Sequence, residues 1–142
     1  MLRLGGRMMV PKFRVWDETQ HKMLQVDCIE FIDGKAYWAE ASPADGNVQG
    51  GNDGPVGDNS QLKLEQYTGL KDIDDDEIYA GDIVSLDPDD PSFTVFFDDG
   101  KYQVNNGYII YDLNETNMDC EIIGNVHANP ELLEAQHDTR TD

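Results

Sequence analysis

The sequence is poor in positive charge and in long apolar runs, and each shortage excludes a class of protein. Only 10 lysine and arginine residues stand against 29 aspartate and glutamate residues, which gives a net charge of −19 over 142 residues. Direct binding to DNA or RNA relies on many cations that neutralise phosphates, so we do not expect it. No apolar run is long enough to span a bilayer, and arginine and glycine interrupt segment 2–10 too often for a signal peptide. We expect a cytoplasmic protein without membrane contact.

Cysteine and histidine are also scarce. Cys28 and Cys120 lie far apart and belong to no metal-ligand or redox motif, so we predict that each is a buried free thiol in a reducing compartment. The three histidines, His21, His127 and His137, accompany no serine or cysteine motif of a nucleophilic enzyme. The sequence therefore assigns no catalytic residue, no cofactor and no metal, and predicts a protein that is not an enzyme.

The acidic residues are concentrated in the second half of the chain. Residues 1–71 contain 8 basic and 10 acidic residues, whereas residues 72–142 contain 2 and 19, so the halves carry net charges of −2 and −17. Such a surface repels phosphate backbones and attracts cations or a basic protein surface. The same acidity also keeps a protein soluble without any specific role.

The apolar residues mostly alternate with polar ones and are separated by turn dipeptides, which is typical of β-strands. An Asp-Gly pair at residues 33–34 predicts a two-residue hairpin turn. That turn would place Phe31 opposite Ala36 and Ile29 opposite Trp38. Residues 42–60 lack large apolar side chains, so we expect a flexible insertion there.

A three-stranded meander is predicted from Phe93 onward. An Asp-Gly turn at residues 99–100 and an Asn-Gly turn at residues 106–107 agree on one buried face. Asp98 would oppose Lys101 as a favourable cross-strand pair. The apolar rows on the buried face would be Val95-Val104-Ile109 and Phe97-Tyr102-Tyr111.

Two more strands and one helix complete the predicted fold. Strands are expected at residues 81–84 and 121–126, and Asn129 could cap a short helix that begins at Pro130. The number and shortness of the strands indicate a mainly β fold: a partly open, SH3-like small barrel over residues 67–128, with an N-terminal β segment and a short C-terminal helix.

Several short motifs lie along the chain, at Lys12–Asp17, Gln66–Asp72, Glu77–Val84, Glu121–His127 and Asn129–Leu133. Together these motifs resemble the YopX family, small proteins encoded by bacteriophages and prophages. The resemblance implies the same fold and a bacterial host cell, but no biochemical activity. We expect an unstructured leader at residues 1–8, a single domain at 9–134 and a polar tail at 135–142.

An acidic turn at residues 72–77 is the best metal candidate in the sequence, because alternate aspartates can direct oxygen ligands at one cation. It does not fit an EF-hand loop. Counting Asp72 as the first position puts Glu77 where the turn glycine belongs and Ile83 where the bidentate glutamate belongs. We therefore predict a solvated turn without a metal.

Three functional hypotheses follow. The first is a non-enzymatic module that binds an unidentified protein partner in an aromatic groove with an acidic rim. The second is an acidic mimic of nucleic acid that inhibits a host DNA-binding enzyme. The third is a cation-dependent enzyme. Self-association into a homo-oligomer through a free strand edge is also open. The candidate partner-binding residues are Tyr67, Tyr79, Asp74, Asp75, Asp76, Asp89 and Asp90.

Overall fold

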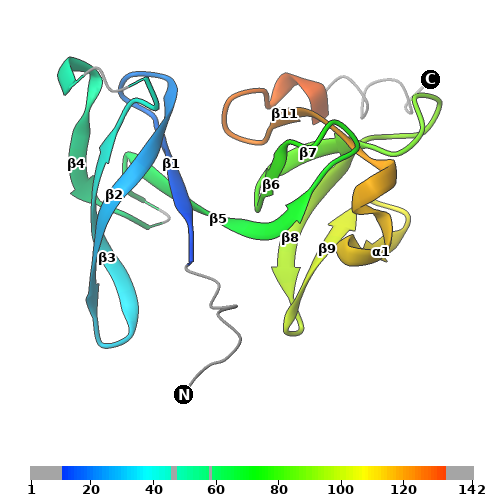
Figure 1. Cartoon of the computed structure of the whole chain (residues 1–142), viewed down its shortest axis with the longest axis horizontal. Coiled ribbons are helices and arrows are strands. Elements are labelled where there is room, and N and C mark those ends of the chain that lie inside the picture. The colour runs from blue at the N-terminus through cyan, green and yellow to red at the C-terminus, as the bar shows by residue number, and fades with distance from the viewer. Residues whose placement is uncertain (1–10, 46–47, 58, 134–142) are drawn as a thin grey trace.

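A computed structural model describes residues 11–45, 48–57 and 59–133 of the chain and shows two open antiparallel sheets (Figure 1). The predicted leader at 1–8 and tail at 135–142 lie outside the described residues. The first sheet has, from edge to edge, β4 (Asn52–Pro55), β3 (Lys35–Ser42), β2 (Lys22–Ile32), β1 (Phe13–Asp17), β5 (Leu62–Lys71) and β6 (Glu77–Tyr79). The second has β10 (Ile110–Asp112), β9 (Lys101–Asn105), β8 (Phe93–Asp98), β7 (Asp82–Ser85) and β11 (Glu121–Asn125).

Strand β5 connects the two halves of the molecule. It is ten residues long, pairs with β1 in its first half and with β6 in its second, and runs from one sheet to the other in Figure 1. The mainly β class, the N-terminal β segment and the partly open architecture that we predicted are confirmed. The segment predicted as a small barrel, residues 67–128, supplies the second sheet together with β6.

The described residues form two apolar cores. In the first, Val15 of β1 packs with Leu24 and Leu62 inside the first sheet. Trp16, the next residue along β1, is also buried. The second core contains Ile78, Val84, Phe93, Val95, Val104, Leu113 and Cys120. The two sets of buried apolar residues share no member.

The hairpin between β2 and β3 follows the prediction at its tip only. Asp33 and Gly34 both have positive φ, as a mirror-image two-residue turn requires, and Phe31 lies opposite Ala36. The pairing of Ile29 with Trp38 is wrong. An irregularity between Glu30 and Phe31 inserts one extra residue into β3, so that Trp38 lies opposite Glu30.

The meander is confirmed at its first turn and wrong at its second. Phe97 lies opposite Tyr102 and Val95 opposite Val104. The turn at residues 106–109 is longer than predicted, because Asn106 Oδ1 accepts the backbone N–H groups of residues 108 and 109 at 2.9 Å. Val104 therefore faces Tyr111 rather than Ile109. The row of Phe97 is not buried, since Phe97 is 58% exposed.

Three smaller predictions need correction. Residues 42–60, expected to be a flexible insertion, contain a 3-10 turn, η2 (Val48–Gly50), and strand β4 paired with β3. Lys101 lies opposite Asp98 as predicted, but its ammonium contacts Asp112 at 2.8 Å. Helical residues occur at 131–133, where the helix was expected, but additional helical turns, α1 (Leu113–Thr116) and η3 (Asn117–Asp119), precede β11.

Candidate functional site

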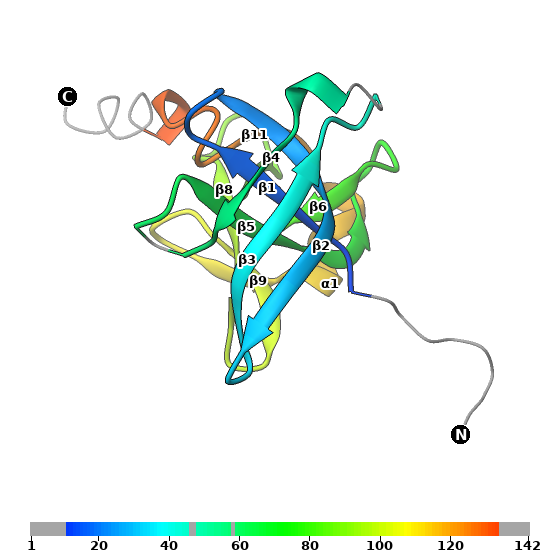
Figure 2. The ribbon, with the colours of Figure 1, turned by 90° about the vertical axis from the view of Figure 1, so that its left-hand side faces the viewer.

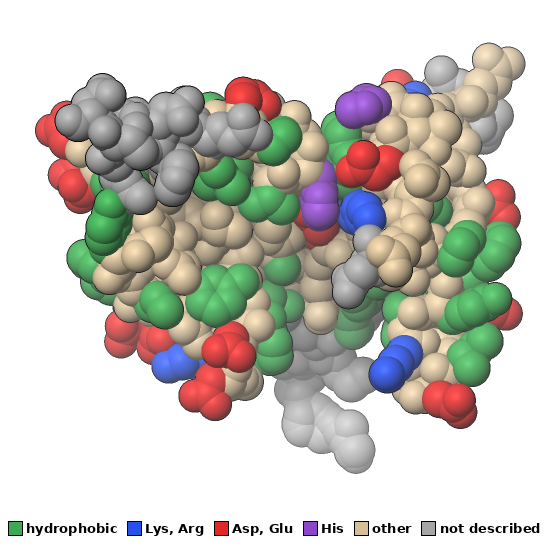
Figure 3. All heavy atoms as spheres, turned by 180° about the vertical axis from the view of Figure 1, so that it is seen from behind, with side chains coloured by type: hydrophobic (Ala, Val, Ile, Leu, Met, Phe, Trp, Pro, Cys, Tyr) green, Lys and Arg blue, Asp and Glu red, His purple; other side chains and the backbone are tan. Residues whose placement is uncertain are grey.

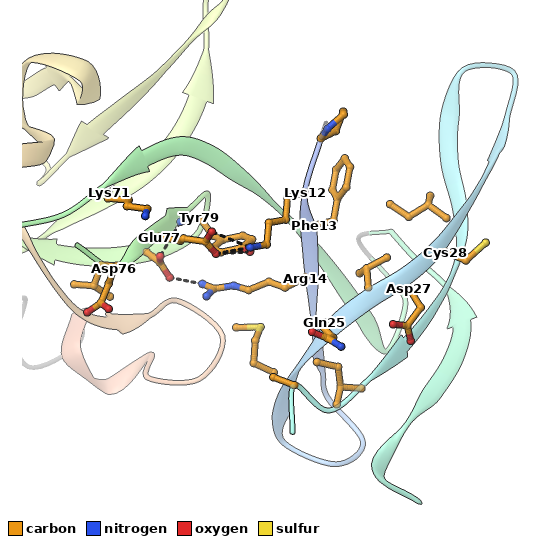
Figure 4. A pocket seen from close by; sticks show the side chains of 18 of the residues that line it. Lys12, Phe13, Arg14, Gln25, Asp27, Cys28, Lys71, Asp76, Glu77 and Tyr79 are labelled. Atoms are coloured by element: carbon orange, nitrogen blue, oxygen red, sulfur yellow. Dashed lines mark hydrogen bonds and ion pairs between the residues drawn. The ribbon is translucent and has the colours of Figure 1, made fainter. Parts of the chain in front are cut away.

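An open groove of about 1170 Å³ lies between the two sheets. One wall comes from β1 and β2, and the other from residues 71–82 and Ile122 (Figure 4). Figure 2 shows β2 and β3 in front of the second sheet, and Figure 3 shows the two halves of the molecule side by side from behind. The groove mixes apolar side chains, such as Met23 and Ile29, with charged ones.

A buried polar cluster joins the two sheets at the base of this groove. It consists of Arg14, Glu65, Asp82 and Asn125, which we call the joint cluster. Arg14 donates from Nε to Glu65 at 2.9 Å and from Nη2 to Asp82. The amide of Asn125 donates to both oxygens of Glu65 at 3.0 Å and to Asp82 at 3.2 Å. Every member except Arg14 is at most 5% exposed.

The strand register explains how the joint cluster forms. Arg14 lies directly opposite Glu65 in the first sheet, and Asp82 lies opposite Asn125 in the second. Each sheet therefore contributes one cross-strand pair, and the pairs meet between the sheets. Gly81 makes this approach feasible: it has φ +99°, and a Cβ there would lie 2.4 Å from the Glu65 carboxylate.

The joint cluster holds two buried carboxylates with one cation. Burial raises the pKa of Glu65 above its ordinary value, even though Arg14 and the Asn125 amide favour the charged form. His127 Nε2 lies 3.7 Å from Glu65, and burial lowers the pKa of this imidazole. Both carboxylate oxygens of Glu65 and both of Asp82 accept hydrogen bonds. Asp82 also accepts the backbone N–H of Tyr79 at 2.8 Å.

An aromatic pair borders the groove. Tyr67 and Tyr79, two of the candidate binding residues, lie opposite each other on β5 and β6, with ring centroids 5.5 Å apart. The guanidinium of Arg14 lies 4.1 Å from the Tyr79 ring centroid, and Lys12 lies 5.8 Å from that of Tyr67. Lys12 also contacts Glu77 at 2.8 Å, visible in Figure 4, and this hydrogen bond raises the pKa of Lys12. Only Tyr79 lines the groove directly.

The acidic turn after β5 is built around Asp72, which is 2% exposed. Its carboxylate accepts three backbone N–H groups at 2.9 Å, from Asp74, Asp76 and Ile122. The carboxylates of Asp72, Asp74 and Asp76 come close enough to hold a cation, but the oxygens of Asp72 already serve the backbone. Asp72 thus fixes the turn against β11, and Asp75 and Asp76 reach the groove.

The second acidic loop is a separate feature. Asp89 and Asp90 are exposed, and the Asp89 backbone N–H bonds to Asp87 Oδ1 at 2.9 Å, which shapes a local turn. Neither residue is among those that line the groove. Of the predicted binding residues, the structure therefore brings Tyr79, Asp75 and Asp76 to one groove, with Tyr67 packed behind Tyr79.

Sequence reasoning did not find the joint cluster. Glu65 was one of 29 acidic residues, and nothing in its local pattern distinguishes it from the others. Two weak signals existed. The charged Arg14 lies on the same strand face as the buried Trp16, and Gly81 directly precedes Asp82 at the start of a strand.

The two cysteines differ. Cys120 is buried as predicted, and burial raises the pKa of its thiol to about 11. Cys28, predicted to be buried, is exposed and lines the groove, beyond the stretch of β2 that pairs with β1.

Among the described residues, no helix has the length and apolar character needed to cross a membrane. A family model described as "YopX protein" matches residues 12–134. No curated protein matches the sequence significantly. Among solved structures, protein EF1440 from Enterococcus faecalis is 26% identical, with a TM-score of 0.64, and covers 89% of this chain and 99% of its own. YopX from Bacillus subtilis is 25% identical, with a TM-score of 0.55 and coverage of 86% and 97%.

Proposed function

The chain belongs to the YopX family, and we propose that it is a non-enzymatic protein-interaction module of bacteriophage or prophage origin that acts inside the bacterial host cell. The groove between the two sheets carries the proposal. It is large, open to solvent and walled by two separate sheets, so it can receive a segment of another protein.

The composition of the groove favours a protein partner. Met23, Ile29 and Phe31 supply apolar contacts from β2, and Phe31 is 58% exposed. Asp75 and Asp76 supply negative charge from the opposite wall. Apolar anchors with a charged rim are the usual composition of protein interfaces.

The bonding of the carboxylates supports a non-enzymatic role. Glu65 and Asp82 are buried carboxylates beside the groove, and both are already bonded to Arg14 and Asn125. A catalytic acid or base needs an oxygen that can reach a substrate. Asp72 is likewise committed to backbone N–H groups.

A matched pair of substitutions tests the proposal. Phe31 lies in the groove and Phe97 outside it, yet both are 58% exposed and both precede an Asp-Gly hairpin turn by two residues. Tagged wild type, Phe31→Ser and Phe97→Ser proteins would be used to capture partners from a lysate of phage-infected bacteria, followed by low-salt and high-salt washes.

We expect one partner that wild type and Phe97→Ser retain through the high-salt wash and that Phe31→Ser loses. Equal recovery with all three proteins would contradict the groove as the binding site. A DNA-binding enzyme that all three capture and that salt elutes would instead support nucleic-acid mimicry, because charge alone would hold it.

A further inference from the structure

Within the described part of the chain, strand β2 lacks a partner along one edge beside the groove. It extends over Lys22–Ile32, but β1 pairs only with Lys22–Gln25. The remaining stretch, residues 26–32, pairs with β3 on one side, and no described strand pairs with it on the other. The backbone groups that point to that side are those to which an added strand would bond.

This edge has the features of a docking strand. Its residues Val26, Asp27, Cys28, Ile29 and Phe31 line the groove, so an added strand would lie within it. The stretch contains neither lysine nor proline, residues that commonly protect free edges from pairing. An irregularity between Val26 and Cys28 leaves Asp27 as an extra residue in β2, a distortion that limits indiscriminate edge-to-edge association.

The charges around the edge select the partner. The cations of the groove already have acidic partners: Arg14 contacts Asp82, Lys12 contacts Glu77, and Lys71 lies 3.9 Å from Asp75. The carboxylate of Asp76, by contrast, has no hydrogen bond or ion pair with the described residues, and that of Asp27 has only the hydroxyl of Ser42 at 2.7 Å.

We propose that a basic, extended segment of a partner protein adds to β2 as a new antiparallel or parallel strand along residues 26–32, with its cations facing Asp27 and Asp76 and its apolar side chains facing Ile29 and Phe31. The inference rests on the proposed function, because it specifies how the groove binds its partner. A second copy of this chain is a poorer occupant, since its net charge of −19 would oppose association.

The probe is a synthetic octapeptide, acetylated and amidated at its ends, in which lysine alternates with valine. The control peptide is identical except that every residue carries an N-methyl group, which removes the backbone donors from both edges of the strand and keeps the charge. Calorimetry with the full chain gives the affinities. Hydrogen exchange followed by NMR reports on the individual amides of residues 26–32.

We expect the unmethylated peptide to bind at least tenfold more tightly than the methylated one. It should also slow exchange at alternate amides of residues 26–32, the ones that face away from β3. The double variant Asp27→Asn, Asp76→Asn should weaken binding about three- to tenfold, an effect typical of neutralised surface charges. The control variant Glu40→Gln, Asp89→Asn removes the same charge from exposed positions outside the groove and should leave the affinity unchanged.

Three outcomes would overturn the inference. Equal binding of both peptides would mean side-chain contacts without strand addition, which leaves the proposed function intact. No binding of either peptide would exclude a basic strand, whereas the Phe31→Ser and Phe97→Ser comparison would still decide the proposed function. Slow exchange at all amides of residues 26–32 in the free protein would show that the edge is already paired, and sedimentation would distinguish a second copy from another segment of the same chain.

Discussion

Replacing Arg14 by methionine should show how much the joint cluster contributes to the free energy of unfolding. The Arg14 side chain is 21% exposed, and its guanidinium is the only cation in direct contact with both Glu65 and Asp82 within the described structure. Methionine keeps the apolar length of the side chain but leaves two buried carboxylates without a cation. Breaking a buried pair in this way costs about 3–5 kcal/mol, because the remaining charge loses its partner but stays out of water.

The cost should depend on pH with a defined sign. The pKa of Glu65 is already raised by burial in the native protein, and the loss of Arg14 raises it further. A carboxyl group with a raised folded-state pKa contributes stability that is present below its unfolded pKa and is lost as pH rises through the folded pKa. The destabilisation caused by Arg14→Met should therefore be largest at pH 7.5 and smaller by about 1 kcal/mol or more at pH 5.

Urea unfolding at the two pH values measures both effects. The control is Lys12→Met, which removes a cation from an exposed pair with Glu77 and should cost no more than about 1 kcal/mol at either pH. If Arg14→Met cost no more than Lys12→Met, the cluster would not hold the sheets together as argued. A large cost without pH dependence would show that packing of the side chain, rather than the carboxylate charges, is responsible.

Three further predictions concern other buried groups. Burial alone would raise the pKa of Asp17, but its hydrogen bonds lower this pKa below the ordinary value of 3.8. Asp17→Asn should therefore destabilise the protein by about 1–3 kcal/mol at pH 7, and this cost should shrink as pH falls below about 4. A cost that stays constant in acid unfolding curves would contradict this prediction. Gly81→Ala should cost at least about 2 kcal/mol, because alanine is strained at positive φ and its Cβ would collide with Glu65; a midpoint of urea unfolding like that of wild type would refute this. A thiol reagent at pH 8 should modify only Cys28 in the native protein, and both Cys28 and Cys120 after unfolding. Mass spectrometry measures the modification, and rapid reaction of both cysteines in the native protein would contradict the burial of Cys120.

The parts of the fold that depend on local chemistry could be read from the sequence. Asp-Gly dipeptides at 33–34 and 99–100 form mirror-image turns, because their residues tolerate positive φ, and both hairpins have the predicted pairing next to the turn. The Asn-Gly pair at 106–107 misled the same reasoning. The side chains of Asn105 and Asn106 bond to the backbone of the loop and hold it open by two more residues.

The candidate site was less accessible to sequence reasoning. Tyr67 and Tyr79 were found as candidates because of their aromatic side chains, and the structure pairs them on β5 and β6. Glu65 and Asp82 meet through Arg14 and Asn125 only because of how the two sheets lie together, and no local pattern encodes that arrangement. The exposure of Cys28 is likewise not encoded locally, since this residue lies beyond the stretch of β2 that pairs with β1.

The joint cluster and the groove are parts of one arrangement. The two apolar cores share no buried residue. Strands β5 and β6 join the two halves, because they belong to the first sheet and supply Leu70 and Ile78 to the second core. The bonds from Arg14 to Asp82 and from Asn125 to Glu65 also cross from one sheet to the other. Arg14 and Asp82 also line the groove, so the same bonds set its width. A buried ion cluster adds little net stability compared with apolar packing, but it requires a specific geometry. The cluster therefore fixes where the acidic turn lies relative to β2, and with it the shape of the groove that we propose binds a partner strand.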